Sequence, residues 1–242
     1  MAEGDRERLD AWLAHRGLGS RSQVRALIRS GRVRVGNRVE RDAAAIVAAT
    51  AAVAVDGQVI AGEPPPGTLL LHKPTGCACS HDPREAPLVY DLLPPAWARL
   101  GFESAGRLDR DTSGLLVLSR DGALIHALTA PRRRHGKRYR IAYAGTLAAD
   151  AIAQVAAGLR LDGEAQPTLP AELDVAAPGR ATLILHEGRF HQVRRMIAAL
   201  GGTVTALHRD RIGALDLPGD LGPGQVRAAR ADELARLTAP AP

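Results

Sequence analysis

Lysine, cysteine, aromatic residues and long apolar runs are all scarce in this sequence of 242 residues. The two cysteines, Cys77 and Cys79, cannot fill the four positions of a structural zinc site, and their short separation disfavours a disulfide between them. No apolar run approaches the roughly 20 residues of a membrane span. The polar stretch from Met1 to Arg8 lacks the apolar core of a secretory signal. We therefore expect reduced, strand-borne thiols, no bound metal, no membrane association and a cytoplasmic location.

Arginine supplies almost all of the positive charge, because Lys73 and Lys137 are the only lysines among 32 basic residues. The formal net charge is +6 and the sequence pI is about 10.1. This balance favours a polyanionic partner, because basic side chains displace condensed counterions from phosphates. Nucleic acid is the first candidate and an anionic membrane surface the second, although a coding bias toward arginine would produce the same skew.

The first sixty residues predict two short helices followed by a basic hairpin. The apolar residues between Leu9 and Leu13 have helical spacing, and a second helix begins at Ser20, where Gln23 completes a capping box. Gly36-Asn37 offers a two-residue hairpin turn. Three basic residues share one sector of the second helix and are candidate RNA contacts: Arg21, Arg25 and Arg29.

The segment from Arg21 to Arg41 contains seven arginines and one acid, Glu40. A merely solvated surface is normally mixed in sign, so this density favours contact with nucleic acid. Two helices and a basic hairpin of this length resemble the S4 domain, an RNA-binding module. The Pro- and Gly-rich stretch that follows predicts a linker, which gives an RNA-binding domain over 1–61, a linker over 62–67 and a second domain over 68–242.

The second domain alternates short β-like runs with helical stretches, which predicts an α+β fold. Helical spacing from Val193 to Leu200, stopped by Gly201-Gly202, gives its clearest helix. The predicted strands are Thr68 to His72, Leu115 to Ser119, Tyr139 to Ala144, Thr182 to His186 and Thr203 to Leu207.

A polar, turn-rich segment from Gly106 to Gly114 leads directly into the apolar strand Leu115 to Leu118, which a turn at Asp121-Gly122 follows. A loop held by a rigid strand is a good place for a catalytic carboxylate such as Asp109. The alternative is that the polar side chains in this segment only satisfy backbone groups in Asx-type turns. Local composition favours that alternative, so the choice depends on a wider match.

The wider match consists of Gly106-Arg107-Leu108-Asp109 with Thr112 and Gly114-Leu115-Leu116, then Lys73-Pro74, Lys137-Arg138-Tyr139, and Glu187 to Met196. With these motifs the sequence resembles the RsuA-type and RluA-type pseudouridine synthases over nearly its whole length. The motifs fall in the family's order and approximate spacing. The resemblance implies an S4-like domain of two helices and a hairpin, followed by a catalytic domain with a mixed or antiparallel sheet and flanking helices.

The resemblance also implies roles in converting uridine to pseudouridine, which needs neither metal nor cofactor. Asp109 would be the nucleophile or base, and Arg194 would lie opposite it in an ion pair that lowers its pKa. Tyr139 would lie against the uracil, although it could instead be a strand tyrosine packed in the sheet. Arg107 would hold the flipped nucleotide or fill the vacated space. His191 and Gln192 would be structural or base-orienting.

Further basic residues are candidate contacts to RNA in the second domain. These are Lys73, Arg132, Arg133 and Lys137, although Arg132 and Arg133 could also belong to a solvated basic loop. The segment from Leu207 to Gly213 and the stretch from Cys79 to Pro83 resemble the small-subunit rRNA enzyme more than its large-subunit relatives. We therefore expect a monomer that acts on small-subunit rRNA or on an assembling ribosomal particle.

Three rival functions stay open. A large-subunit (23S) rRNA synthase would share every catalytic residue and differ in the RNA that it binds. A non-catalytic ribosome-assembly factor of the same fold would bind RNA without needing an intact Asp109, Tyr139 and Arg194. A glycoside hydrolase could use Asp109 and Asp111, but two positions on one loop are poorly placed to flank a sugar, and the basic surface does not fit that function.

Overall fold

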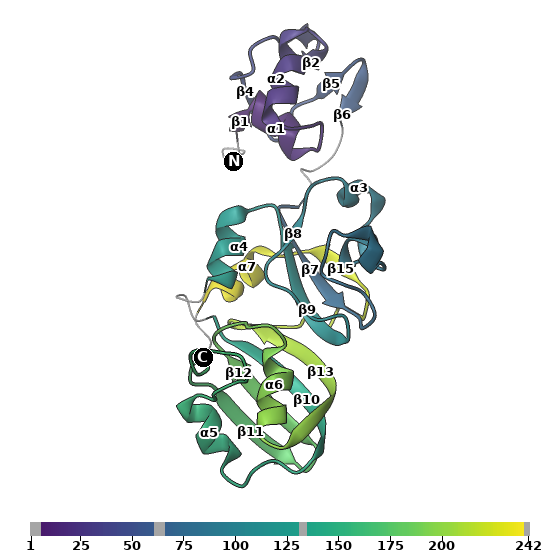
Figure 1. Cartoon of the computed structure of the whole chain (residues 1–242). Coiled ribbons are helices and arrows are strands. Elements are labelled where there is room, and N and C mark those ends of the chain that lie inside the picture. Colours follow the sequence, from purple (N-terminus) through teal and green to yellow (C-terminus); the bar gives the residue numbers. More distant parts are fainter. Residues whose placement is uncertain (1–5, 61–65, 131–134, 240–242) are drawn as a thin grey trace. The chain divides into compact units, whose positions relative to one another are not determined.

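The computed structural model describes residues 6–60, 66–130 and 135–239, apart from the side chain of Ala96. The chain forms two compact units, Met1–Pro66 and Gly67–Pro242. Figure 1 shows both units, coloured along the sequence. Most of the predicted linker lies outside the described residues, as do Arg132 and Arg133. Within the described ranges, no helix is long and apolar enough to cross a bilayer.

The first unit packs two helices, α1 (Leu9–His15) and α2 (Arg21–Arg29), beside a four-stranded antiparallel sheet in the order β3-β2-β5-β6. The predicted capping box at Ser20 is present, with the Gln23 backbone N–H donating to the Ser20 hydroxyl. The remaining elements are β1 (Arg6–Arg8), β2 (Val33–Val35), β3 (Arg38–Val39), β4 (Ile46–Ala48), β5 (Val53–Val55) and β6 (Gln58–Ile60), with β1 paired to β4.

This unit has a small apolar core of its own. Trp12 and Leu13 of α1 are buried against Val24 and Ile28 of α2, and Val53 of the sheet joins them. The predicted hairpin turn is confirmed, because Val35 pairs with Arg38 across it. The three arginines of α2 therefore lie outside a core that the helices and sheet complete without them.

The second unit is built on a nine-stranded mixed sheet with the main order β11-β12-β10-β13-β9-β7-β15, while β14 pairs with β13 and β8 with β9. Only the β9–β13 pairing is parallel among the described strands. The strands are β7 (Thr68–Lys73), β8 (Glu103–Ser104), β9 (Thr112–Ser119), β10 (Lys137–Gly145), β11 (Glu172–Ala177), β12 (Arg180–Leu185), β13 (Gly202–Ile212), β14 (Leu215–Asp216) and β15 (Val226–Ala228).

Helices cover both faces of this sheet, so its central strands are apolar on both sides. On β9, Leu116 and Leu118 join the core formed with α5 (Ala151–Ala157) and α6 (Gln192–Ala199). Leu115 and Val117 alternate with them and join the opposite core, formed with α4 (Gly122–Thr129) and α7 (Ala231–Thr238). Figure 1 shows α6 across β10 and β13. The expected α+β architecture is confirmed.

Two local expectations differ from the structure. Cys77 and Cys79 are free thiols in the loop that follows β7, not on a strand, because the chain turns at Thr75-Gly76 before it reaches them. Asp121 caps the start of α4 by accepting from two backbone N–H groups, where we expected only a turn. Two 3₁₀ turns (Pro83–Glu85 and Val89–Leu92) and the short α3 (Pro95–Ala98) complete the unit.

Candidate active site

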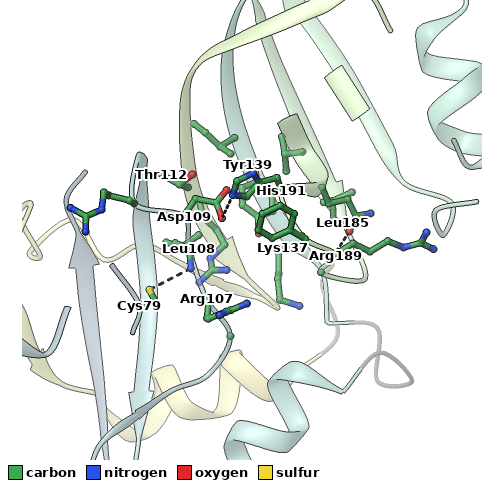
Figure 2. Close-up of a pocket in the computed structure, with 18 of the residues that line it drawn as sticks. Cys79, Arg107, Leu108, Asp109, Thr112, Lys137, Tyr139, Leu185, Arg189 and His191 are labelled. Carbon is green, nitrogen blue, oxygen red and sulfur yellow. Dashed lines mark hydrogen bonds and ion pairs between the residues drawn. The ribbon is translucent and has the colours of Figure 1, made fainter. Parts of the chain in front are cut away.

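A cavity of about 490 Å³ opens where β13 meets the start of β9. Its walls come from the loop after β7, the loop before β9, the start of β10 and the turn between β12 and α6. Figure 2 shows side chains from these segments gathered around it. Four of the predicted site residues line the cavity: Arg107, Asp109, Lys137 and Tyr139. Lys73 and Arg194 do not line it.

Lys73 anchors the loop that carries Asp109. Its ammonium donates to the carbonyl oxygens of Pro74 at 3.0 Å, Arg110 at 3.3 Å and Thr112 at 2.9 Å. The side chain is fully buried, and burial lowers the pKa of Lys73. The expectation that Lys73 contacts RNA is therefore wrong, because its ammonium is occupied by backbone carbonyls below the surface.

The rest of the loop is fixed by a buried leucine. Leu108 is buried in the core, and its backbone N–H lies 3.5 Å from the sulfur of Cys79. The flanking Arg107 and Asp109 both line the cavity. A turn closed by the Thr112 N–H and the Asp109 carbonyl, at 3.0 Å, joins the loop to β9. The Asp109 carboxylate is thus carried on a short segment that is held at both ends.

His191 is the residue that contacts Asp109. Its Nε2 atom lies 3.6 Å from Asp109 Oδ1, and Figure 2 shows the two side chains pointing toward each other. The His191 backbone is left-handed, with φ 47°, which is uncommon for a residue other than glycine. Its ring stacks on Phe190 at a centroid distance of 3.9 Å, and Phe190 is 73% exposed beside the cavity.

Gln192 holds the turn that presents His191. Its side-chain oxygen accepts from the Arg189 N–H at 2.9 Å, and its nitrogen donates to Glu187 at 2.8 Å. Glu187 also accepts from the Leu169 N–H and from the Arg189 side chain. Both oxygens of the Glu187 carboxylate therefore hold this turn in place, although the residue lines the same cavity as Asp109.

Arg194 does not pair with Asp109, which corrects our expectation. From α6, its Nη2 atom lies 2.9 Å from Oδ2 of Asp111. Asp111 stands two residues beyond Asp109, on the exposed side of the turn, and its side chain is 68% exposed. The spacing of the motif gave the correct loop and the correct helix, but it could not show which of the two aspartates the guanidinium reaches.

Three strands supply the base of the cavity. Lys137 of β10 is opposite Leu185 of β12, and Tyr139 of β10 is opposite Arg209 of β13. Tyr139 is 9% exposed, so its ring is mostly enclosed while it lines the cavity. Burial, and then the charge of Arg209, lower the pKa of Lys137 to about 8. Gly114 allows β9 to approach β13 here, because a Cβ on it would lie 2.1 Å from the Arg209 carbonyl oxygen.

Sequence reasoning missed Arg209 as a site residue, although it lines the cavity and is 1% exposed. The signal that could have found it is its alternation with Leu207 on β13, which puts both residues on one face of a strand. The sequence reasoning also missed Cys79, which lies at the same cavity and whose pKa is raised by burial.

In the first unit, the predicted RNA-contacting arginines do not share one environment. Arg21 and Arg29 are exposed and form no ion pair within the described residues. Arg25 instead donates to the buried Asp10 at 2.8 Å. Hydrogen bonds from Arg8 and Arg25 hold the pKa of Asp10 well below its usual range.

Across both units, the described side chains include no group of three that could ligate a metal.

Comparisons with known proteins match both units. Residues 67–199 match the model of the RNA pseudouridylate synthase family, and residues 7–53 match the S4 domain. Proteins named ribosomal small subunit pseudouridine synthase A are similar over nearly their whole length. The protein from Escherichia coli (strain K12) is 39% identical and that from Vibrio cholerae is 37% identical, each over 95% of this chain and 99% of the relative.

One solved structure is similar across both units. A crystal structure of a pseudouridylate synthase superposes with a TM-score of 0.68 at 33% sequence identity, over 96% of this chain and 99% of the other. Both units therefore resemble those of a protein of that name.

Proposed function

Because the chain belongs to the RNA pseudouridylate synthase family, and is therefore an isomerase that converts uridine to pseudouridine, we propose that its substrate is a uridine of small-subunit rRNA. The relatives that match over 95% of the chain carry that substrate in their names. The exposed arginines of the S4 unit bind the phosphate backbone of the RNA independently of its sequence. A monomer in the cytoplasm, acting on rRNA or on an assembling particle, is part of the same proposal.

The reaction sets the chemical demands on the site. The bond between uracil N1 and the ribose breaks, the base turns, and C5 replaces N1, so that one hydrogen leaves C5 and N1 gains one. The target nucleotide must leave its stack before the site can act on it. The cavity of about 490 Å³ has the size of a small-molecule site, which suits one nucleoside turned out of the RNA.

We assign Asp109 as the catalytic carboxylate, because one observation distinguishes it from the other acids at the cavity. Both carboxylate oxygens of Glu187 are engaged, since they accept hydrogen bonds from Leu169, Arg189 and Gln192. Glu85 lies on an exposed 3₁₀ turn. The Asp109 side chain is 32% exposed, and its one ion pair among the described residues is with His191. An ionised carboxylate in this position is available to attack the sugar or to remove a proton.

The neighbouring residues then take supporting roles. Tyr139 presents an enclosed aromatic ring with a polar tip, which suits contact with uracil and assistance in removing the C5 proton. Arg107, exposed beside Asp109, is placed to hold the nucleotide that has left its stack. Arg194 is a positioning residue that acts through Asp111 and ties the loop to α6.

Tritium release from small-subunit rRNA labelled at uracil C5 tests this proposal directly, because isomerisation must expel that hydrogen. We expect Asp109→Asn to reduce the rate by at least about 10²-fold. Asp111→Asn is the matched control, since it makes the same change two residues along the loop, and we expect a loss of no more than about fivefold. Release that survives Asp109→Asn would exclude Asp109 as the catalytic group, and release from large-subunit rRNA alone would overturn the substrate assignment.

A further inference from the structure

Arg209 is a buried arginine whose charge is not neutralised by any carboxylate in the part of the chain that the structure describes. Its side chain is 1% exposed, and Nε donates to the Leu115 carbonyl at 3.0 Å. Nη2 is buried and has no hydrogen-bond partner, and no described acid lies within ion-pair distance. Arginine is seldom fully buried unless it is paired, because an unpaired buried charge is costly. The pairing group is therefore expected to come from outside the chain.

The strand register places Arg209 beside Tyr139 at the cavity. Arg209 is opposite Tyr139, and the β10–β13 ladder shifts its register between Arg138 and Tyr139. The shift leaves Asp210 as an extra residue on β13, where it pairs with Arg138 at 2.8 Å and with Arg140 at 2.5 Å. The acid next in sequence to Arg209 is thus used by two other arginines, as is common where a bulge re-aims side chains near a site.

Lys137 is a second cation at the same cavity, and none of the described acids pairs with it. Its ammonium makes one long contact, to the His135 carbonyl at 3.4 Å, and no ion pair within the described residues. The charge of Arg209 is one of the two causes that lower the pKa of Lys137, so the two cations are close enough to repel each other. Two neighbouring cations under partial burial form a site for an anion.

The acids that share the cavity do not neutralise this pair. Asp109 faces His191, and Glu187 is occupied by the turn before α6. Glu85 belongs to an exposed 3₁₀ turn. The substrate class of the proposed function carries one anionic group beside each base, its phosphodiester. A uracil carbonyl could also accept from these groups, but a neutral oxygen would not offset two positive charges.

We propose that Lys137 and Arg209 together bind the phosphate adjoining the target uridine, once that nucleotide occupies the cavity. The inference rests on the proposed function and deepens it, because it names the group that anchors the nucleotide. Arg209 presents a planar fork that matches a phosphate, and Lys137 supplies a point charge. The phosphate then fixes the ribose relative to Asp109 before the base reacts.

The test compares uridine with uridine 5′-monophosphate and uridine 3′-monophosphate as competitors of tritium release. In the wild-type protein, we expect one of the two nucleotides to inhibit at least about tenfold better than uridine, the effect of a charge-assisted hydrogen bond. Lys137→Gln and Arg209→Lys should each reduce this advantage toward one and leave inhibition by uridine unchanged. Lys137 is only half-buried, so its variant keeps the test sound if Arg209→Lys fails to fold.

The other outcomes overturn the inference. Equal inhibition by uridine and both nucleotides would show that no phosphate is bound, and equal weakening of uridine in the variants would place the pair on a uracil carbonyl. Nucleotide binding is also followed by NMR saturation transfer without RNA. A phosphate advantage that is seen there in the absence of any tritium release would refute the proposed function while keeping the anion site.

Discussion

The left-handed backbone of His191 brings its Nε2 atom to 3.6 Å from Oδ1 of Asp109. The contact joins the loop before β9 to the turn before α6, and both segments line the cavity. Residues held in sparsely populated backbone regions concentrate at functional sites. The geometry at His191 therefore points to a role in setting the orientation of the Asp109 carboxylate.

His191→Asn separates the side-chain contact from the backbone. Asparagine tolerates the left-handed conformation, so the turn should keep its shape while the imidazole is lost. An ion pair with this exposure contributes at most about 1 kcal/mol, so we expect kcat for tritium release to fall by no more than about fivefold. Urea unfolding should be unchanged. A loss of 10²-fold or more would show instead that His191 takes part in the chemistry.

Arg194 and Asp111 should behave as one coupled pair. We expect Arg194→Ala and Asp111→Asn each to lower kcat by no more than about fivefold, and the double variant to match either single one. Arg194→Lys should restore most of the rate, because it keeps the charge. A double-mutant cycle on tritium release measures the coupling. If Arg194→Ala costs far more than Asp111→Asn, the guanidinium serves Asp109 in the RNA complex, as the family resemblance implies.

Substrate binding should weaken as pH rises through the pKa of Lys137. That pKa is about 8, so the ammonium is charged below this value and neutral above it. We expect KM for rRNA to be flat from pH 6 to 7.5 and to rise above pH 8, while Lys137→Arg keeps KM flat to higher pH. The charged groups that share the cavity are Glu85, Arg107, Asp109, Arg110, Glu187, Arg189, His191 and Arg209. An unchanged rise in the variant would assign it to another titratable group at the cavity, such as the thiol of Cys79.

The lowered pKa of Lys137 also predicts how stability depends on pH: substrate binding weakens as pH rises, whereas the free energy of unfolding increases. The unfolded chain has the ordinary lysine pKa of 10.5, so between about pH 8 and 10.5 it binds more protons than the folded protein. The free energy of unfolding therefore rises with pH across this window as far as Lys137 is concerned. Lys137→Met should be more stable than wild type at pH 7, and the difference should shrink toward pH 10.5 in urea titrations.

Gly114 should be intolerant of a side chain, because it lies against the backbone of β13. Gly114→Ala places a Cβ 2.1 Å from the Arg209 carbonyl, in addition to the strain at φ 120°. Gly163→Ala is the matched control, because φ is 77° there and nothing lies within 4 Å. We expect a loss of unfolding free energy above about 3 kcal/mol for the first and about 1 kcal/mol for the second. Equal losses would show that strain alone matters.

Local patterns predicted the parts of the fold that depend on neighbours in sequence. The capping box at Ser20 and the helix that ends before Gly201 are set by interactions within a few residues. The order β11-β12-β10-β13-β9-β7-β15 depends instead on pairings between distant strands, which no local pattern contains. Motif spacing thus identified the elements of the fold, and the family resemblance supplied its architecture.

In the site, too, motifs identified some residues, while the contacts of others depend on the fold. Asp109 and Tyr139 were found through motifs, and both line the cavity. The partner of Arg194 could not be deduced, because two aspartates on one turn differ only in which way each points. Lys73 was misassigned for a similar reason: a lysine in a basic protein suggests phosphate contact, and only the fold shows that three carbonyls surround it.

The parallel contact between β9 and β13 has a consequence for protein synthesis. Arg209 completes the cavity from a position 94 residues beyond Leu115, whose carbonyl it binds. The S4 unit, by contrast, closes its core within the first sixty residues. Domains fold N-terminal first as the chain leaves the ribosome. The S4 unit of a nascent chain can therefore fold well before the catalytic centre, which is assembled only when β13 has emerged.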